Sequence, residues 1–149
     1  MITNEIIKLE NGAKVPKLGL GVWMIPEEET EAAVKSAIAM GYRHIDTAQA
    51  YDNEAGVGAG VRNCGVPREE LFITSKIAAE NKSYESAMES IDESLSVMGL
   101  DYIDLMIIHS PQPWVEVNQS ENRYFEENIQ VWKALEDAYK AGKVKAIGL

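Results

Sequence analysis

Asp46 and Tyr51 lie five residues apart, and together these two side chains could transfer a proton. Asp46 lies near the end of a predicted strand at residues 44–47, and Tyr51 follows after a turn. A carboxylate at the end of a buried strand, with a phenol just beyond it, is a common way to place proton-transfer groups on a parallel sheet. The alternative is an Asp46 that caps a helix and a Tyr51 that is an ordinary surface residue.

Two more polar side chains, Lys76 and His109, follow further predicted strands along the chain. A short buried strand at residues 71–74 reaches Lys76, and a nearly continuous apolar strand at residues 103–108 reaches His109. Because the carboxyl ends of parallel strands meet at one edge of a sheet, we expect both side chains to lie near Asp46.

If such a site reacts with a carbonyl group, Tyr51 is its natural proton donor. The ammonium of Lys76 would favour the phenolate that remains, and Asp46 could supply the counter-charge that a buried lysine needs. His109 could donate a hydrogen bond to the carbonyl oxygen or polarise it. Two alternatives stay open: a purely structural ion pair between Asp46 and Lys76, and a His109 that only satisfies the end of its strand.

His44 and Cys64 are interpreted as structural residues. His44 begins its strand and is therefore expected on the opposite face from the groups at the strand's end. That polarity disfavours a metal site made of His44, Asp46 and His109, and we predict no metal. Cys64 is the single cysteine, so the chain can form no internal disulfide and no cysteine-based metal cluster.

The composition indicates a globular, acidic protein. The chain has 149 residues and a formal net charge of −10, with 46% hydrophobic residues. The absence of a basic run argues against nucleic acid or an anionic membrane as a partner. The N-terminus lacks a positively charged region followed by an apolar run, and no apolar stretch approaches about 18 residues. We therefore expect a soluble, cytoplasmic protein.

Strand and helix patterns alternate along most of the chain. A hairpin is predicted at residues 6–15, with a type I′ turn at Asn11-Gly12, and Trp23 follows the first strand of the main sheet. Strands are predicted within residues 17–22, 44–47, 71–74, 103–108 and 144–149. Helices are predicted from Pro26, after Asn53, from Ser83 as an N-cap, and along the stripe Ile129, Trp132, Leu135 and Tyr139 with a Glu136–Lys140 pair. The helix after Asn53 has weak support because it contains Gly56, Gly58 and Gly60. The alternation predicts an α/β fold with a parallel sheet.

Four separated motifs then identify a family. Residues 41–48 read Gly-Tyr-Arg-His-Ile-Asp-Thr-Ala, with Tyr51 and Asn53-Glu54 just beyond, and residues 71–76 read Leu-Phe-Ile-Thr-Ser-Lys. Residues 98–105, running into 107–109, and residues 142–149 supply the other two. With these motifs in this order, the chain resembles the N-terminal part of the aldo-keto reductases. The resemblance implies one domain over residues 1–149, with a hairpin at 1–16 and the first half of a (β/α)₈ TIM barrel at 17–149.

The resemblance also implies an activity, the NAD(P)H-dependent reduction of an aldehyde or ketone. In the family pattern Tyr51 is the acid, Lys76 and Asp46 tune it, and His109 orients the carbonyl. The cofactor would be NADPH or NADH, and the substrate a small-molecule carbonyl. The residues implied in cofactor binding are Gly21, Val22 and Asp46, and those in substrate binding are Trp23, His109 and Trp114.

Two departures from the family pattern bear on function. Ala78 and Ser110 stand where relatives often have tryptophans, which predicts a wider carbonyl pocket that Trp114 could partly fill. A complete barrel takes roughly 250 residues, whereas this sequence ends at the fifth strand. We therefore expect most of the cofactor site to be missing from it. The alternative is a non-catalytic half-barrel that self-associates through its open sheet edge or docks on a partner.

Overall fold

A short antiparallel hairpin precedes the main sheet. The computed structural model describes residues 5–149, so the first four residues of the predicted hairpin segment lie outside it. Strand β1 (Ile6–Lys8) pairs with β2 (Lys14–Pro16). The predicted type I′ turn is wrong, because Gly12 has a positive φ of 87° and Asn11 does not. The amides of Leu9 and Gly12 instead bond to the carbonyls of Ala13 and Leu9, which gives a three-residue loop closed by the left-handed glycine.

Five parallel strands form the main sheet, in the spatial order β3-β4-β5-β6-β7. Their bounds are Leu20–Gly21, His44–Asp46, Phe72–Ile77, Leu105–Ile108 and Ile147–Gly148. The registers place Gly21 beside Asp46, Asp46 beside Thr74 and Lys76 beside Ile107. The carboxyl ends of β3 to β6 therefore lie along one edge of the sheet, as the alternation of elements predicts.

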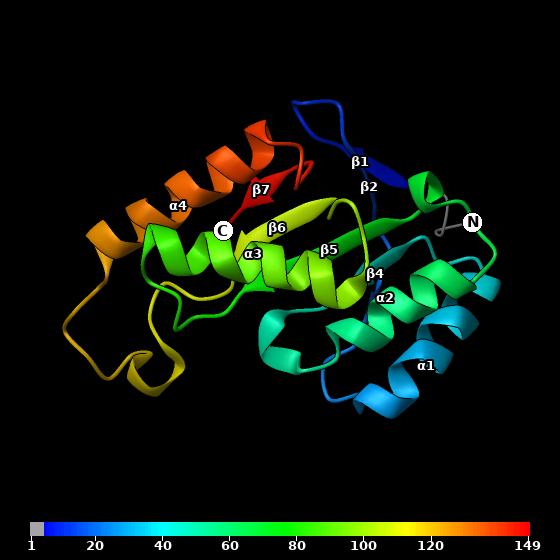
Figure 1. The fold of residues 1–149 in the computed structure, drawn as a ribbon, viewed down its shortest axis with the longest axis horizontal. Helices are drawn as coiled ribbons and strands as arrows, with labels where there is room; N and C mark the ends of the chain where they lie inside the picture. Colours follow the sequence, from blue (N-terminus) through cyan, green and yellow to red (C-terminus); the bar gives the residue numbers. More distant parts are fainter. Residues whose placement is uncertain (1–4) are drawn as a thin grey trace.

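Helices connect the strands and cover one face of the sheet. They are α1 (Glu27–Ala39), α2 (Glu54–Asn63), α3 (Tyr84–Met98) and α4 (Phe125–Lys140), with single turns η2 (Gln49–Tyr51), η3 (Arg68–Glu70) and η4 (Trp114–Glu116). Figure 1 shows α3 crossing in front of the strands, with α1 and α2 beside each other at one end and α4 at the other. Within residues 5–149, no helix has the length and apolarity needed to cross a membrane.

Helix α2 forms despite its three glycines, because they permit close helix packing. A Cβ added at Gly56 would lie 2.8 Å from the Cβ of Thr30, and one at Gly60 would lie 2.7 Å from the Cβ of Val34, both on α1. A Cβ at Gly58 would overlap the backbone of Met98 at the end of α3. The propensity cost of each glycine, about 1 kcal/mol, is offset by the apolar surface that this approach buries.

Helix α3 begins and ends as predicted. The hydroxyl of Ser83 accepts a hydrogen bond from the amide of Ser86 at 3.1 Å, and Ser86 completes a capping box. Gly99 then ends the helix with a φ of 62°. These caps satisfy backbone groups that the helix itself leaves unpaired.

The predicted stripe of α4 is right at the buried Leu135 and the partly buried Trp132, and wrong at its two ends. Ile129 and Tyr139 are 48% and 43% exposed, and the residues that the helix buries are Val131, Ala134, Leu135 and Ala138. The predicted Glu136–Lys140 pair is also wrong. Lys140 pairs with Asp137 at 3.0 Å, while Glu136 accepts a hydrogen bond from the indole of Trp132.

Candidate active site

Lys76 occupies the centre of the candidate site. It lies near the end of β5, a strand buried along its whole length between β4 and β6, and its side chain is only 11% exposed. Its Nζ donates to Asp46 Oδ1 at 2.6 Å, to the carbonyl oxygen of Thr47 at 2.7 Å and to the hydroxyl oxygen of Tyr51 at 3.3 Å. These three acceptors compensate the cost of burying an ammonium group.

Tyr51 ends η2, the single turn that follows β4. The turn is closed by a bond of 3.0 Å from the Tyr51 amide to the carbonyl of Ala48, and it ends at Asp52, which has a φ of 55°. The chain therefore reverses immediately after the tyrosine, and this leaves the phenol beside the lysine. Lys76 Nζ lies 4.8 Å from the centre of the Tyr51 ring.

His109 follows β6 and closes the other side of the site. Its ring lies edge-on to the Tyr51 ring, with centroids 5.7 Å apart, and edge-on to the Trp114 ring at 5.0 Å. Burial, and then the charge of Lys76, lower the pKa of His109 below its usual value of 6.5. The imidazole is therefore mostly neutral at neutral pH. Its Nδ1 is buried and has no hydrogen-bond partner in the part of the chain that the structure describes.

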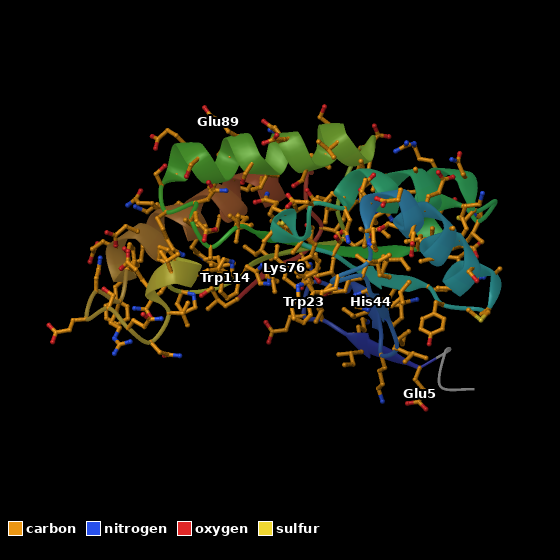
Figure 2. The ribbon with its side chains drawn as sticks, turned by 90° about the horizontal axis from the view of Figure 1, so that it is seen from below. Glu5, Trp23, His44, Lys76, Glu89 and Trp114 are labelled. Carbon is orange, nitrogen blue, oxygen red and sulfur yellow. The ribbon has the colours of Figure 1, made fainter. Side chains whose placement is uncertain are left out.

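Trp23 is held at the tip of a turn by the buried side chain of Asn53. The Nδ2 of Asn53 donates to the carbonyls of Val22 and Ile25 at 2.9 and 3.0 Å, and its Oδ1 accepts from the Thr47 hydroxyl. Trp23 itself is 69% exposed. Figure 2 shows Trp23, Lys76 and Trp114 on the face of the sheet opposite α3.

The predicted cofactor residues differ in what they can offer. Gly21 is exposed, and a Cβ built on it meets no atom within 4 Å, so the surface beside Asp46 is open there. Val22 is fully buried, and its amide already donates to the Asp46 carbonyl at 3.0 Å. A ligand on this surface would therefore meet the exposed Gly21 and Trp23 on either side of Val22, and not Val22 itself.

The two positions that depart from the family pattern leave space in different ways. Ala78 follows β5 and has only a methyl group. The Ser110 side chain is buried and turns back into its own loop, where it donates to the carbonyl of Gln112 at 2.8 Å. Trp114 comes from that same loop, and it is the bulky side chain that reaches His109.

His44 lies outside this group because it is at the other end of β4 from Asp46. The predicted opposite face is wrong, since residues 44 and 46 are two apart and share one side of the strand. One ring nitrogen contacts the Thr74 hydroxyl at 2.9 Å, and the other contacts the Pro16 carbonyl at 3.2 Å. Both nitrogens are thus engaged in bonds that join β4 to β5 and to the hairpin. Among residues 5–149, no three His, Cys, Asp or Glu side chains come together as metal ligands.

Three residues that shape the site are not evident from the sequence. The carbonyl of Thr47 holds the ammonium, Asn53 holds the Trp23 turn, and Gln49 bonds to the chain just after β5. Every residue has a backbone carbonyl, so the residue type at position 47 does not indicate that this carbonyl accepts from Lys76. Asn53 directly precedes α2, where an asparagine is expected to cap the helix, but its side chain forms no cap and bonds to the neighbouring turn instead.

The arrangement is suited to proton donation. It places a phenol, an ammonium, a carboxylate and a neutral imidazole together at the edge of the sheet. A phenol that loses its proton next to an ammonium leaves a phenolate stabilised by that charge.

Comparison with known proteins points to one family. The model of the Aldo/keto reductase family matches residues 17–149. Morphine 6-dehydrogenase from Pseudomonas putida is 46% identical over 98% of the chain, and glyoxal reductase from Bacillus subtilis is 44% identical over 97%. Those alignments cover 46% and 49% of the two relatives, so the chain spans about half the length of the curated relatives it matches.

Solved structures agree with this assignment. An aldo/keto reductase from Brucella melitensis superposes with a TM-score of 0.86 at 38% identity, over 97% of this chain and 51% of that one. An aldo-keto reductase from Bombyx mori, solved in complex with NADP, gives a TM-score of 0.82 at 34% identity, over 97% and 49%. The predicted fold, an α/β chain corresponding to half of a (β/α)₈ barrel, is confirmed.

Proposed function

The chain belongs to the aldo/keto reductase family, and we propose that it carries the proton-transfer site for the reduction of an aldehyde or ketone by NADPH or NADH. One observation carries the proposal: the Nζ of Lys76 joins the Asp46 carboxylate, at 2.6 Å, to the Tyr51 hydroxyl, at 3.3 Å. An ammonium held between a carboxylate and a phenol is the arrangement that a phenolic general acid requires.

The cofactor proposal rests on the relatives and on the surface around Gly21. The Bombyx mori structure contains NADP, and its chain aligns with nearly all of this one. Gly21 leaves open space on the strand beside Asp46. A phenol that donates a proton needs a separate hydride source in order to reduce a carbonyl group. We propose that Gly21 and Asp46 line the nicotinamide side of the site, with the buried Val22 supporting them from behind. When bound, the nicotinamide supplies a hydride to the carbonyl carbon.

The residues of this chain would then move the proton. As the carbonyl carbon gains its new C–H bond, the π electrons shift to oxygen, and the Tyr51 O–H bond breaks as a new O–H bond forms. Lys76 stabilises the phenolate, and Asp46 keeps the ammonium charged. The neutral ring of His109 donates to the carbonyl oxygen from the opposite side. Tyr51 regains its proton from water after the alcohol leaves.

Trp23, His109 and Trp114 are proposed to form the substrate pocket. The two indoles are 69% and 45% exposed, so they have apolar surface available to a ligand. The small side chain at Ala78 leaves that pocket open on the β5 side. We propose a small carbonyl compound as the substrate, in keeping with a relative named glyoxal reductase.

Replacing Tyr51 by phenylalanine tests the proposal. Tyr51→Phe removes the donated proton and leaves the ring, so kcat should fall by roughly 100- to 10,000-fold. The measurement is the loss of NADPH absorbance with a panel of small aldehydes. Because the chain spans about half the length of its relatives, kinetics here and below are measured on a protein that carries this sequence within a complete barrel. Tyr139→Phe, on the exposed side of α4, makes the same chemical change away from the site and should keep wild-type turnover.

Cofactor binding is measured separately, by quenching of tryptophan fluorescence with NADPH. Tyr51→Phe should give the same quenching curve as the wild type, because the phenol oxygen is proposed to act on the substrate and not to bind the cofactor. Wild-type turnover by Tyr51→Phe would contradict the acid assignment. A wild-type complete barrel that turns over no aldehyde on the panel would contradict the proposed activity.

A further inference from the structure

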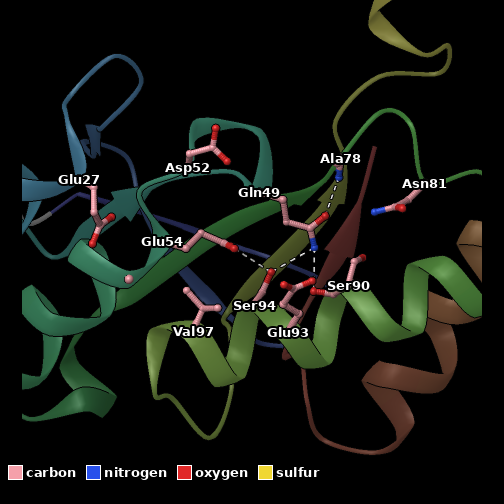
Figure 3. Close-up of a pocket in the computed structure, with 11 residues that line it drawn as sticks. Glu27, Gln49, Asp52, Glu54, Ala78, Asn81, Ser90, Glu93, Ser94 and Val97 are labelled. Atoms are coloured by element: carbon pink, nitrogen blue, oxygen red, sulfur yellow. Dashed lines mark hydrogen bonds between the residues drawn. The ribbon is translucent and has the colours of Figure 1, made fainter.

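A cavity of about 500 Å³ lies on the helical side of the sheet, behind the candidate site. It is bounded by η2, the first turn of α2, the chain after β5, and α3, as Figure 3 shows. Several acidic side chains line it, and each is either bonded within the protein or exposed at its mouth. One lining residue, Gln49, belongs to η2, the turn that carries Tyr51, and Figure 3 shows its amide bonded to neighbouring residues of the cavity.

Both ends of the Gln49 amide are engaged. Its Nε2 donates to the Ser90 carbonyl at 3.0 Å and to the Ser94 hydroxyl at 3.1 Å, both on α3. Its Oε1 accepts from the backbone amide of Ala78 at 2.7 Å. Ser94 is fixed in turn, since its hydroxyl donates to the buried carboxylate of Glu54 at 3.0 Å. One half-buried side chain therefore ties η2 to two other elements.

The positions of these bonds along the chain relate Gln49 directly to Tyr51 and Lys76. Gln49 opens the turn that Tyr51 ends, and Ala78 lies two residues after Lys76. The amide thus joins the tyrosine's turn to the end of the lysine's strand. At 3.3 Å, the Tyr51 contact is also the longest of the three that Lys76 makes. That contact is too weak to fix the phenol by itself.

We propose that Gln49 is a positioning residue that holds the Tyr51 hydroxyl in place against Lys76 for proton transfer. The inference rests on the proposed function, because it needs Tyr51 to be the proton donor. Gln49 touches neither the phenol nor the space in front of it. It acts by fixing the backbone of η2, so its loss lets the phenol oxygen drift from the reactive geometry, where about 1 Å can cost roughly 100-fold in rate.

The test uses Gln49→Met, which keeps the length of the side chain and loses its three hydrogen bonds. The first readout needs no activity. The chain is labelled with fluorotyrosine, and the fluorine resonance of Tyr51 is identified by its absence in Tyr51→Phe. We expect Gln49→Met to move the Tyr51 resonance toward that of free fluorotyrosine and to leave the other tyrosine resonances in place. An unmoved Tyr51 resonance overturns the inference.

The second readout is kinetic. In Gln49→Met, kcat should fall by about 10- to 100-fold, with the KM for the aldehyde nearly unchanged, because the lost interaction acts on the transition state and not on substrate binding. A wild-type kcat overturns the inference even if the resonance moves. A rise in KM with kcat unchanged overturns it as well, because that pattern indicates a role in substrate binding.

Ser90→Ala is the matched control. Ser90 offers Gln49 only its backbone carbonyl, and its hydroxyl bonds to the Ala87 carbonyl instead, so this variant keeps all three Gln49 bonds. It should match the wild type in both readouts. If Gln49→Met does not fold, Ser94→Ala removes one of the three bonds, and a smaller shift of the Tyr51 resonance in the same direction supports the inference while no shift overturns it.

The two proposals fail in different ways. A wild-type complete barrel without carbonyl reduction contradicts the proposed function, and the fluorine experiment still decides whether Gln49 positions Tyr51. If Gln49→Met reduces the carbonyl at the full wild-type rate, that result contradicts the inference about Gln49 and leaves the proposed function standing.

Discussion

Lys76 has no ammonium hydrogen left for a ligand. An ammonium group has three donors, and all three are directed to Asp46, to the Thr47 carbonyl and to Tyr51. Lys76 can therefore influence a substrate only through the phenol. The Asp46 side chain is 35% exposed against 11% for Lys76, so the carboxylate is the partner that still faces the open space beside Gly21.

At the same scale, the two histidines should titrate below the ordinary range. Burial is the first cause that lowers the pKa of both His44 and His109 from 6.5. Because folding lowers these pKa values, each histidine's contribution to stability is complete above about pH 6.5 and is lost as the pH falls through the lower folded value. The check is an NMR titration of the imidazole resonances, with His44→Gln to assign them. A midpoint at or above 6.5 for either ring would contradict this environment.

At the scale of elements, Gly58 is the position where α2 meets the end of α3. Gly58→Ala should raise helix propensity, but its methyl group would overlap the Met98 backbone, which cannot move aside as a side chain can. We expect a net loss of about 1–3 kcal/mol in the free energy of unfolding, measured with urea. Gly21→Ala places its methyl group in open space and serves as the control, with little change in stability.

The sequence predicted the strand ends well because topology alone brings them together. Asp46, Lys76 and His109 belong to elements far apart in the chain, yet parallel strands must end at one edge, and the structure places all three within one site. Tyr51 is added by the turn that follows β4. This part of the arrangement depends on the order of elements and not on the detail of side-chain packing.

The sequence predicted other elements poorly where packing decides between alternatives. Along α4, helical periodicity fits more than one face, and the structure buries the one with Ala134 and Ala138. The glycines of α2 weaken a local helix signal, although they make its contact with α1 possible. The role of Gln49 depends on Ala78 and Ser94, and no local pattern connects these three residues.

At the scale of the whole molecule, the sheet separates two kinds of environment. One face is covered by the four helices, and the other carries Trp23, Lys76 and Trp114, as Figure 2 shows. Glu54 is an ionisable group on the helical side, 8% exposed, and it joins three elements. Its carboxylate accepts from Ser75 of β5 at 2.5 Å and from Ser94 of α3 at 3.0 Å.

Glu54 should make the stability of the whole fold depend on pH. Burial raises its pKa above the ordinary 4.5, although the two serine hydroxyls oppose this shift. Because the folded pKa is the higher one, the stabilising contribution is complete below about pH 4.5 and is lost as the pH rises through the folded value. Glu54→Gln removes that loss, so the free energy of unfolding of the variant relative to the wild type should increase from pH 4.5 to pH 8.

Urea unfolding of both proteins at the two pH values measures this difference, and comparison at each pH cancels the contribution of the histidines. Glu89→Gln, on the exposed face of α3 in Figure 2, removes the same charge in water and should follow the wild type at both pH values. A Glu54→Gln variant whose stability relative to the wild type is equal at pH 4.5 and pH 8 would show that the buried carboxylate costs the fold nothing. In that case the bonds from Ser75 and Ser94 would fully balance the burial of its charge.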